Sequence, residues 1–294
     1  MHILRRSYGE LLDVVVPAYG FEGIAGYQTI KSFLLSVRDA IRKGDIRRVP
    51  MGCMLMGPPG TGKTAIAQAF ARECGYIFLV VRNLLNMFVG SSEANNERML
   101  MALRELAPAI VLRDEVDEED SGRQGYQGDS GVSGRIRRMW MQFLSDSTIR
   151  GRVFVISCTN RPDRLDAALK RSGRTDERIP MLMPDHQTRT QLFPVMIQRY
   201  QFPCAEHIDW GVHATETKNF SGADIEVIVR RAYDFAAQDG GIITGECVHH
   251  AIEDFIPSAS QAEIARMTLL AIQETSSKRF LPHDWSEMVA EAKA

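Results

Sequence analysis

The sequence of 294 residues lacks any apolar run close to the ~18 residues that would span a membrane. Its first sixteen residues, MHILRRSYGELLDVVV, are too polar and too interrupted for a secretory signal peptide. The sequence therefore predicts no membrane span and no export, which favours a cytoplasmic location.

Cysteine and net charge are also scarce. The five cysteines are odd in number and none stands in a C-x-x-C pair, so we expect neither a disulfide framework nor a zinc site. Cys53 and Cys158 lie in apolar runs and are predicted to be small core residues. A net charge of −2 gives no global basic field that would attract nucleic acid or a membrane surface.

The composition, 45% hydrophobic and 24% charged, is that of an ordinary globular chain. Short apolar runs alternate with helical patterns, as buried parallel strands do in a doubly wound sheet. The sequence predicts an α/β fold, an αβα sandwich with a five-stranded parallel sheet. The predicted strands are residues 51–56, 77–81, 109–112, 153–158 and 179–183.

Beyond residue 186 the pattern is helical throughout. We predict an α/β domain over residues 1–186 and a small all-helical domain over residues 187–294. Ser221 is a predicted N-cap, and Gly240 and Gly241 form a predicted helix stop. Residues 120–134, rich in Gly and Ser, are predicted to be a loop before a helix at 135–144. The other predicted helices are 187–200, 222–238, 245–255 and 261–275.

A glycine-rich segment follows the first apolar run and precedes a helical pattern that starts near Ala65. Its glycines allow backbone N–H groups to approach a phosphate chain, and the helix adds its positive N-terminal dipole. Lys63 supplies a charge for the β- and γ-phosphates, and the Thr64 hydroxyl is a ligand for Mg²⁺. The residues predicted to bind the nucleotide here are Gly57, Pro58, Pro59, Gly60, Thr61, Gly62, Lys63, Thr64 and Ala65.

Two acidic residues, Asp114 and Glu115, end the apolar run at 109–112. Asp114 is predicted to hold Mg²⁺ through water, and Glu115 to orient and deprotonate the attacking water. A solvated acidic turn is the alternative, because acids after strands are common. The position of the pair, 50 residues after Thr64, favours the catalytic interpretation.

Three further segments, residues 156–163, 171–176 and 220–224, follow these motifs in order. Together the five motifs resemble the AAA subfamily of AAA+ ATPases, P-loop NTPases that remodel proteins. The resemblance extends from about residue 21 to residue 255. It identifies the C-terminal helices as the family's small lid domain.

The resemblance implies roles for individual residues. Asn160 matches the sensor that contacts the γ-phosphate or the attacking water. Arg171 and Arg174 match paired arginine fingers that reach the neighbouring subunit's nucleotide; without the resemblance they would be taken for surface arginines. The residues that match the two adenine-contacting segments are Ile24 and Ala25 on one side and Gly222 and Ala223 on the other.

Residues 87–93 resemble the first pore loop of the family, and 122–134 stand where the second would be. In such a loop Phe88, followed by Val89, lines a central channel and grips an extended polypeptide. The alternative interpretation is that Phe88 is a core residue.

The chain also departs from the family pattern. Arg113 replaces an apolar residue before the acidic pair, so a charge at a buried strand end would need a partner. Ser172 and Thr175 replace Pro and Phe near the fingers, and residues 145–147 read Ser-Asp-Ser where the family has Asp-Gly-Phe. Residues 249–253 do not fit the H-E-x-x-H of the metalloprotease branch, so no protease is expected.

The resemblance implies Mg²⁺-dependent hydrolysis of ATP to ADP by a ring, a homohexamer, that unfolds, disassembles or remodels a protein substrate. A substrate-recruiting domain is expected to be missing or supplied by a separate adaptor. An ATP-dependent switch that acts on a partner without threading it is the alternative. The low net charge and Phe88 disfavour a nucleic-acid motor or loader, and the complete acidic pair disfavours a scaffold without turnover.

Overall fold

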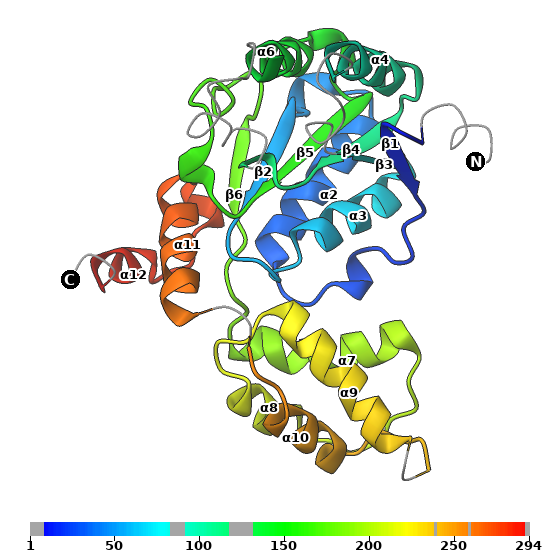
Figure 1. Cartoon of the computed structure of the whole chain (residues 1–294), viewed down its shortest axis with the longest axis vertical. Coiled ribbons are helices and arrows are strands. Elements are labelled where there is room, and N and C mark those ends of the chain that lie inside the picture. The colour runs from blue at the N-terminus through cyan, green and yellow to red at the C-terminus, as the bar shows by residue number, and fades with distance from the viewer. Residues whose placement is uncertain (1–8, 83–91, 118–131, 238–239, 258–259, 292–294) are drawn as a thin grey trace.

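A computed structural model describes residues 9–82, 92–117, 132–237, 240–257 and 260–291 of the chain. Figure 1 shows a larger α/β part, which holds a twisted sheet, above a smaller part built of helices alone. Phe88 and Val89, and most of the predicted loop at 120–134, lie outside the described residues.

The α/β part is built on a six-stranded sheet with the order β1-β3-β4-β5-β2-β6. Strands β2 to β6 are parallel, which confirms the predicted five-stranded parallel sheet. The antiparallel edge strand β1 was not predicted, since four residues of alternating burial give little signal. The strands are β1 Leu12–Val15, β2 Gly52–Met56, β3 Ile77–Val81, β4 Ala109–Arg113, β5 Val153–Thr159 and β6 Glu177–Pro180.

Helices cover both faces of this sheet. Figure 1 shows α2 (Gln28–Arg42) and α3 (Lys63–Cys74) on one side and α4 (Ser92–Glu105) and α6 (Val132–Leu144) on the other. Every residue of β2, β4 and β5 is buried, because central strands of a doubly wound sheet have no solvated face. Cys53 and Cys158 lie fully buried in these strands, as predicted.

The smaller part has a core of its own, to which Phe193, Ile228 and Val229 contribute. It is formed by α7 (His186–Tyr200), α8 (Trp210–Glu216), α9 (Gly222–Ala236) and α10 (Gly245–Glu253). Ser221 is the N-cap of α9, as predicted, and forms a capping box with Asp224. The seven-residue helix α8 was not predicted.

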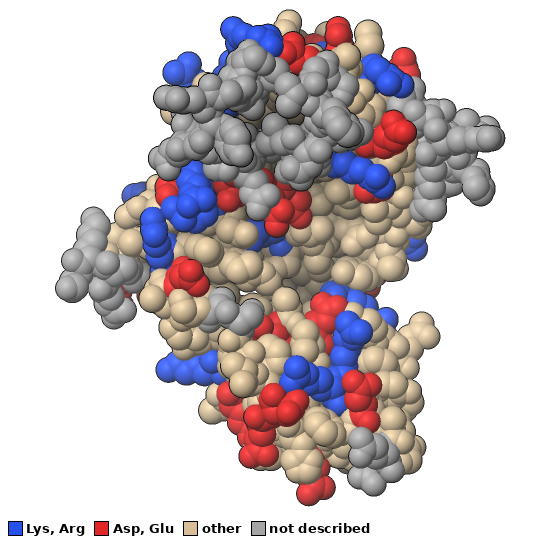
Figure 2. All heavy atoms as spheres, viewed as in Figure 1, with Lys and Arg blue, Asp and Glu red and all other residues tan. Residues whose placement is uncertain are grey.

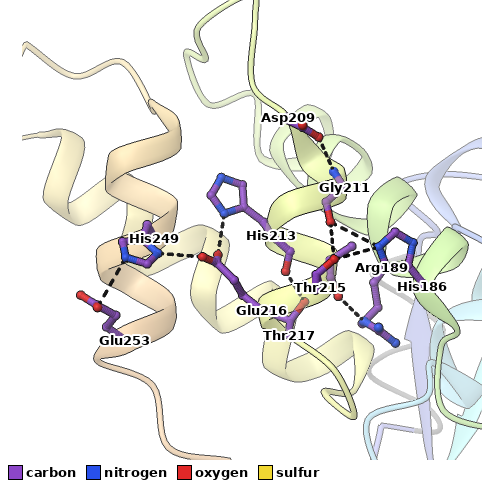
Figure 3. Close-up of polar contacts among 11 residues, drawn as sticks. His186, Arg189, Asp209, Gly211, His213, Thr215, Glu216, Thr217, His249 and Glu253 are labelled. Carbon is purple, nitrogen blue, oxygen red and sulfur yellow. Dashed lines mark hydrogen bonds and ion pairs between the residues drawn. The ribbon is translucent and has the colours of Figure 1, made fainter.

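Polar contacts hold α8 in place, as Figure 3 shows. The Glu216 carboxylate lies 2.9 Å from His213 Nδ1 in α8 and 3.0 Å from His249 Nδ1 in α10. Arg189 of α7 donates to the Ala214 carbonyl at 3.0 Å. These contacts tie α8 to both of its neighbours.

The C-terminal helices α11 (Gln261–Gln273) and α12 (Trp285–Glu291) follow. Helix α11 returns to the α/β part, where Ala271 joins the core and Arg178 Nε donates to the Glu274 carbonyl at 2.7 Å. Helices α7 to α10 form a separate core, whereas residues after 260 pack on the α/β part. The division of the chain into two domains at residue 186 stays a prediction.

Charges of both signs are interspersed on the face of the molecule in Figure 2, in keeping with the small net charge. Among the described residues, no helix is both long enough and apolar enough to cross a membrane.

Candidate active site

A cavity of about 340 Å³ lies between the α/β part and the helical part. It adjoins the carboxyl ends of the parallel strands, where α/β folds bind ligands. The structure brings many of the predicted site residues together here. Those that line the cavity are Ile24, Ala25, Pro59, Gly60, Thr61, Gly62, Lys63, Thr64, Ala65, Asp114, Glu115, Asn160, Gly222 and Ala223.

The glycine-rich loop between β2 and α3 forms one wall of this cavity. Gly60 and Gly62 have φ values of +75° and +87°, which side chains rarely adopt. At Gly57 a Cβ atom would lie 2.1 Å from the Met181 carbonyl oxygen. The loop conformation therefore needs glycine, as a backbone cradle for phosphate does. Gly57 and Pro58 begin this loop but do not line the cavity.

Lys63 begins α3 and is buried. Its Nζ donates to the carbonyl oxygens of Gly57 and Pro58 at 2.9 and 2.7 Å. Burial lowers the pKa of the ammonium, and the nearby Asp114 and Asp117 carboxylates oppose that shift. A phosphate in the loop would give this charge a stronger partner than two neutral carbonyls.

Thr64 and Asp114 meet although 50 residues separate them. The Thr64 hydroxyl donates to Asp114 Oδ2 at 2.7 Å. A hydroxyl beside a carboxylate is an oxygen donor set of the kind Mg²⁺ prefers, so these residues fit the predicted ion. Glu115 follows in the left-handed region with φ +51°, held by its own N–H, which donates to Asp114 Oδ1 at 3.0 Å. Such backbone outliers cluster at functional sites.

Asn160 follows directly after β5. Its Oδ1 is buried and has no hydrogen-bond partner among the described residues. A buried acceptor without a donor costs free energy, so this oxygen fits a bound donor such as water. The neighbouring Thr159 is fixed on both sides: its hydroxyl donates to Asp117 at 2.6 Å and accepts from the Arg161 N–H at 2.9 Å.

Comparison with known proteins bears on this geometry. Residues 53–182 match the family described as "ATPase family associated with various cellular activities (AAA)". The chain is also 35% identical over 228 residues to a cell division cycle protein 48 homolog from Archaeoglobus fulgidus, covering 74% of this chain and 31% of that relative. The chain contains an AAA ATPase domain. The resemblance is thus confirmed, and the chain spans less than a third of the length of this relative.

The phosphate loop of the AAA domain is hydrogen-bonded to the start of α9 and to Tyr27, which precedes α2. The Ala223 N–H at the start of α9 donates to the Gly60 carbonyl at 3.1 Å. The Tyr27 hydroxyl, with one hydrogen to donate, lies within hydrogen-bond distance of the carbonyl oxygens of Thr61 and Leu182, at 2.8 and 2.9 Å. Sequence reasoning missed Tyr27, because neither of these contacts has a signature along the chain.

Other lining residues of the AAA domain were also missed. Several of them occupy one stripe of α7, and such a stripe does not reveal which part of the molecule it faces. The lining residues that were not predicted are Tyr27, Pro184, Thr188, Leu192, Met196, Arg199 and Glu226.

Arg171 and Arg174 do not line the cavity of the AAA domain. They precede the first residue of β6, whereas the phosphate loop follows the last residue of the parallel strand β2. Arg174 donates through Nη1 to the Ala168 carbonyl at 2.7 Å and through Nε to the Ser145 hydroxyl at 3.0 Å. Arg171 is exposed. The two arginines therefore lie near the opposite edge of the sheet from the phosphate loop.

Arg113, the unusual residue before the acidic pair, is buried at the end of β4. Its guanidinium carbon lies 3.9 Å from the centre of the Trp140 ring of α6. A cation over an aromatic face is a favourable contact for a desolvated charge. Trp140 is therefore a partner for the buried charge of Arg113, which was predicted from the sequence to need one.

Proposed function

We propose that this AAA domain binds ATP and hydrolyses it in the cavity between its two parts. The observation that carries the proposal is the 2.7 Å contact between Thr64 and Asp114 beside the buried Lys63. It joins the end of the phosphate loop to the end of β4, where the hydrolytic acid stands next in sequence. Mg²⁺, held by Thr64 and Asp114, would supply charge neutralisation at the phosphates.

The chain's own side chains then bind the phosphates, accept a proton from the attacking water and orient that water. Lys63 exchanges its two loop carbonyls for β- and γ-phosphate oxygens. Glu115 takes a proton from the attacking water, since a carboxylate can act as a general base where an amide cannot. Asn160 Oδ1, the buried acceptor, orients that water. The base lies between Ile24 and Ala25 on one side and α9 on the other.

We further propose that the domain works in a ring, as a homohexamer, on a protein substrate that a separate adaptor can deliver. Support comes from the position of Arg171 and Arg174, which lie away from the chain's own cavity and suit a neighbour's nucleotide. The pore-loop role of Phe88 and Val89 rests on the resemblance and stays a prediction.

Two substitutions separate nucleotide binding from hydrolysis. Lys63→Ala should weaken ATP binding about 10- to 100-fold, because it removes a charge-assisted phosphate contact. Glu115→Gln should keep ATP affinity within a few-fold and lower kcat by about 10²–10⁴. Equilibrium binding and phosphate release measured with Mg²⁺ check both.

Glu253→Gln, an exposed glutamate of α10, is the matched control and should leave both quantities unchanged. Hydrolysis by Glu115→Gln at the unsubstituted rate would show that Glu115 is not the base.

A further inference from the structure

The end of the cavity away from the phosphate loop holds an ion pair that the proposed chemistry does not use. Arg199 of α7 and Glu226 of α9 both line the cavity, with Nη1 and Oε2 3.8 Å apart. Their side chains are largely buried, with 16% and 33% of their surface exposed. A charged pair held inside a ligand cavity is a candidate for recognition of that ligand.

Arg199 is fixed from two directions. Its guanidinium carbon lies 4.2 Å from the centre of the Tyr19 ring, and Nη2 donates to the Gly23 carbonyl at 2.5 Å. Gly23 directly precedes Ile24 and Ala25, which line the same cavity. The Arg199 Nε has no hydrogen-bond partner among the described residues. The guanidinium is therefore held beside the proposed base site and has donor capacity left.

Glu226 is held in a similar way. The Tyr200 hydroxyl donates to Oε1, a bond that raises the pKa of that tyrosine. Among the residues that the structure describes, Oε2 has only the 3.8 Å contact with Arg199, which is too long for a hydrogen bond. One carboxylate oxygen is thus positioned by the protein, and the other keeps its capacity to accept.

The pair stands where a base would lie if phosphates occupied the loop. Ala223, at the start of α9, donates to Gly60 of the loop. Glu226 lies three residues further along α9, a rise of about 4.5 Å and on the same side of the helix. Arg199 is the last residue of a stripe on one face of α7 whose members all line the cavity: Thr188, Leu192, Met196 and Arg199.

The chemistry of the pair matches one kind of purine. Adenine presents its exocyclic amine, a donor, next to a ring nitrogen that accepts, whereas guanine and hypoxanthine carry an accepting carbonyl in place of the amine. We propose that Glu226 Oε2 accepts from the adenine amine while Arg199 donates to the adjacent ring nitrogen. A 6-oxopurine would instead place its carbonyl oxygen against the carboxylate, two acceptors facing each other. The pair is then the element that selects ATP over GTP or ITP, an inference that rests on the proposed ATP site.

Equilibrium binding tests this without turnover. ATP and ITP compete with a fluorescent ADP analogue for the unsubstituted chain and for Glu226→Gln. The unsubstituted chain should prefer ATP. In Glu226→Gln the ratio of the two dissociation constants should fall about tenfold or more, since an amide can donate to the 6-carbonyl and a good base contact contributes discrimination of that order.

Two matched controls accompany the test. Tyr200→Phe removes the hydroxyl that positions Oε1 but leaves the carboxylate and Oε2, so the preference for ATP should fall less than in Glu226→Gln. Glu253→Gln removes a carboxylate outside the cavity and should leave the preference unchanged. If Glu226→Gln does not fold, Glu226→Asp replaces it. This variant keeps the charge but withdraws the carboxylate by one methylene, so the preference should again fall.

The outcomes separate the two proposals. Suppose that Glu226→Gln or Glu226→Asp still binds ATP and that its ratio of ATP to ITP dissociation constants stays within twofold of the unsubstituted chain. That result overturns the role of this pair and leaves the ATP site standing. If the unsubstituted chain binds neither nucleotide, the ATP site itself is wrong and the inference fails with it.

Discussion

Two of the residues that break the family pattern, Arg113 and Ser145, have side-chain partners in this fold. Arg113 stacks on Trp140, and the Ser145 hydroxyl accepts from Arg174. Thr175, where the family has Phe, is buried at 3% exposure. For Arg113 and Ser145 the partner is distant in sequence, so these contacts cannot be predicted from the position alone.

Asp146, which stands in the altered triplet after α6, gives a pH-dependent test. Bonds from the Thr148 hydroxyl and N–H and from Arg104 lower the pKa of this carboxyl to about 2. Because the folded pKa lies below the usual value near 4, the stabilisation is fully present above about pH 4 and is lost as pH falls toward 2. Asp146→Asn should lower the free energy of unfolding by about 1 kcal/mol at neutral pH, a value discounted for solvent screening.

Urea unfolding across this pH range checks the Asp146 prediction. The difference between the variant and the unsubstituted chain should shrink as the pH approaches about 3. Asp45→Asn, whose partner Arg47 is 94% exposed and 3.9 Å away, is the control and should cost less than about 0.5 kcal/mol. A difference that stays constant with pH would contradict the role given to the Asp146 carboxylate.

At the scale of elements, the sequence predicted what apolar patterning determines. Strands β2 to β5 are mainly apolar runs, because both faces of the sheet are covered, whereas β6 begins at the charged Glu177, two residues before the predicted run at 179–183. Strand β1 and helix α8 were missed, since four and seven residues carry too little periodicity. The destination of α11 could not be predicted, because its pattern specifies an apolar face but not which core receives it.

Glu216 tests how the helical part is held together. Glu216→Ala removes the carboxylate that contacts His213 of α8 and His249 of α10 (Figure 3). Since His213 is buried and loses its partner, the free energy of unfolding should fall by about 1–2 kcal/mol. Hydrogen exchange should quicken in α8 and α10 but not in α3, which lies in the α/β part.

Glu253→Ala is the matched control for Glu216. Glu253 contacts the same His249, at 3.4 Å, but its side chain is 64% exposed and spans no gap between helices. Its loss should cost less than about 0.5 kcal/mol. Equal losses for the two variants would show that Glu216 does not link α8 to α10.

At the scale of the whole molecule, the residues that line the site fall into a group that was predicted and a group that was missed. The phosphate loop, Asp114 and Asn160 stand at strand ends, and the carboxyl ends of parallel strands meet at one edge of a sheet. Their approach therefore follows from the order of the elements. Arg199 and Glu226 come from helices of the other part, and their placement depends on how the two parts pack. That packing is determined by three-dimensional contacts such as the bond from Ala223 to Gly60, which leave no periodic signal.

The position of Arg171 before β6 makes assembly of the chain testable. Cys53 of β2 pairs in register with Glu177 of β6, so residues before Glu177 lie about 13 Å or more along the strand direction from the loop that follows Met56. An arginine in that position can serve a nucleotide only across a head-to-tail contact, and such a contact closes into a ring when its rotation allows. ATPase activity per chain should therefore rise with protein concentration.

The Arg171→Ala variant, at an exposed position, should fold normally and lower ATPase activity by about 10³-fold on its own. When it is mixed with unsubstituted protein, the activity of the mixture should fall by more than the fraction of variant added. Arg47→Ala, also exposed, should do neither. Phosphate release measured beside sedimentation decides the matter, and full activity from a monomer at every concentration would refute it.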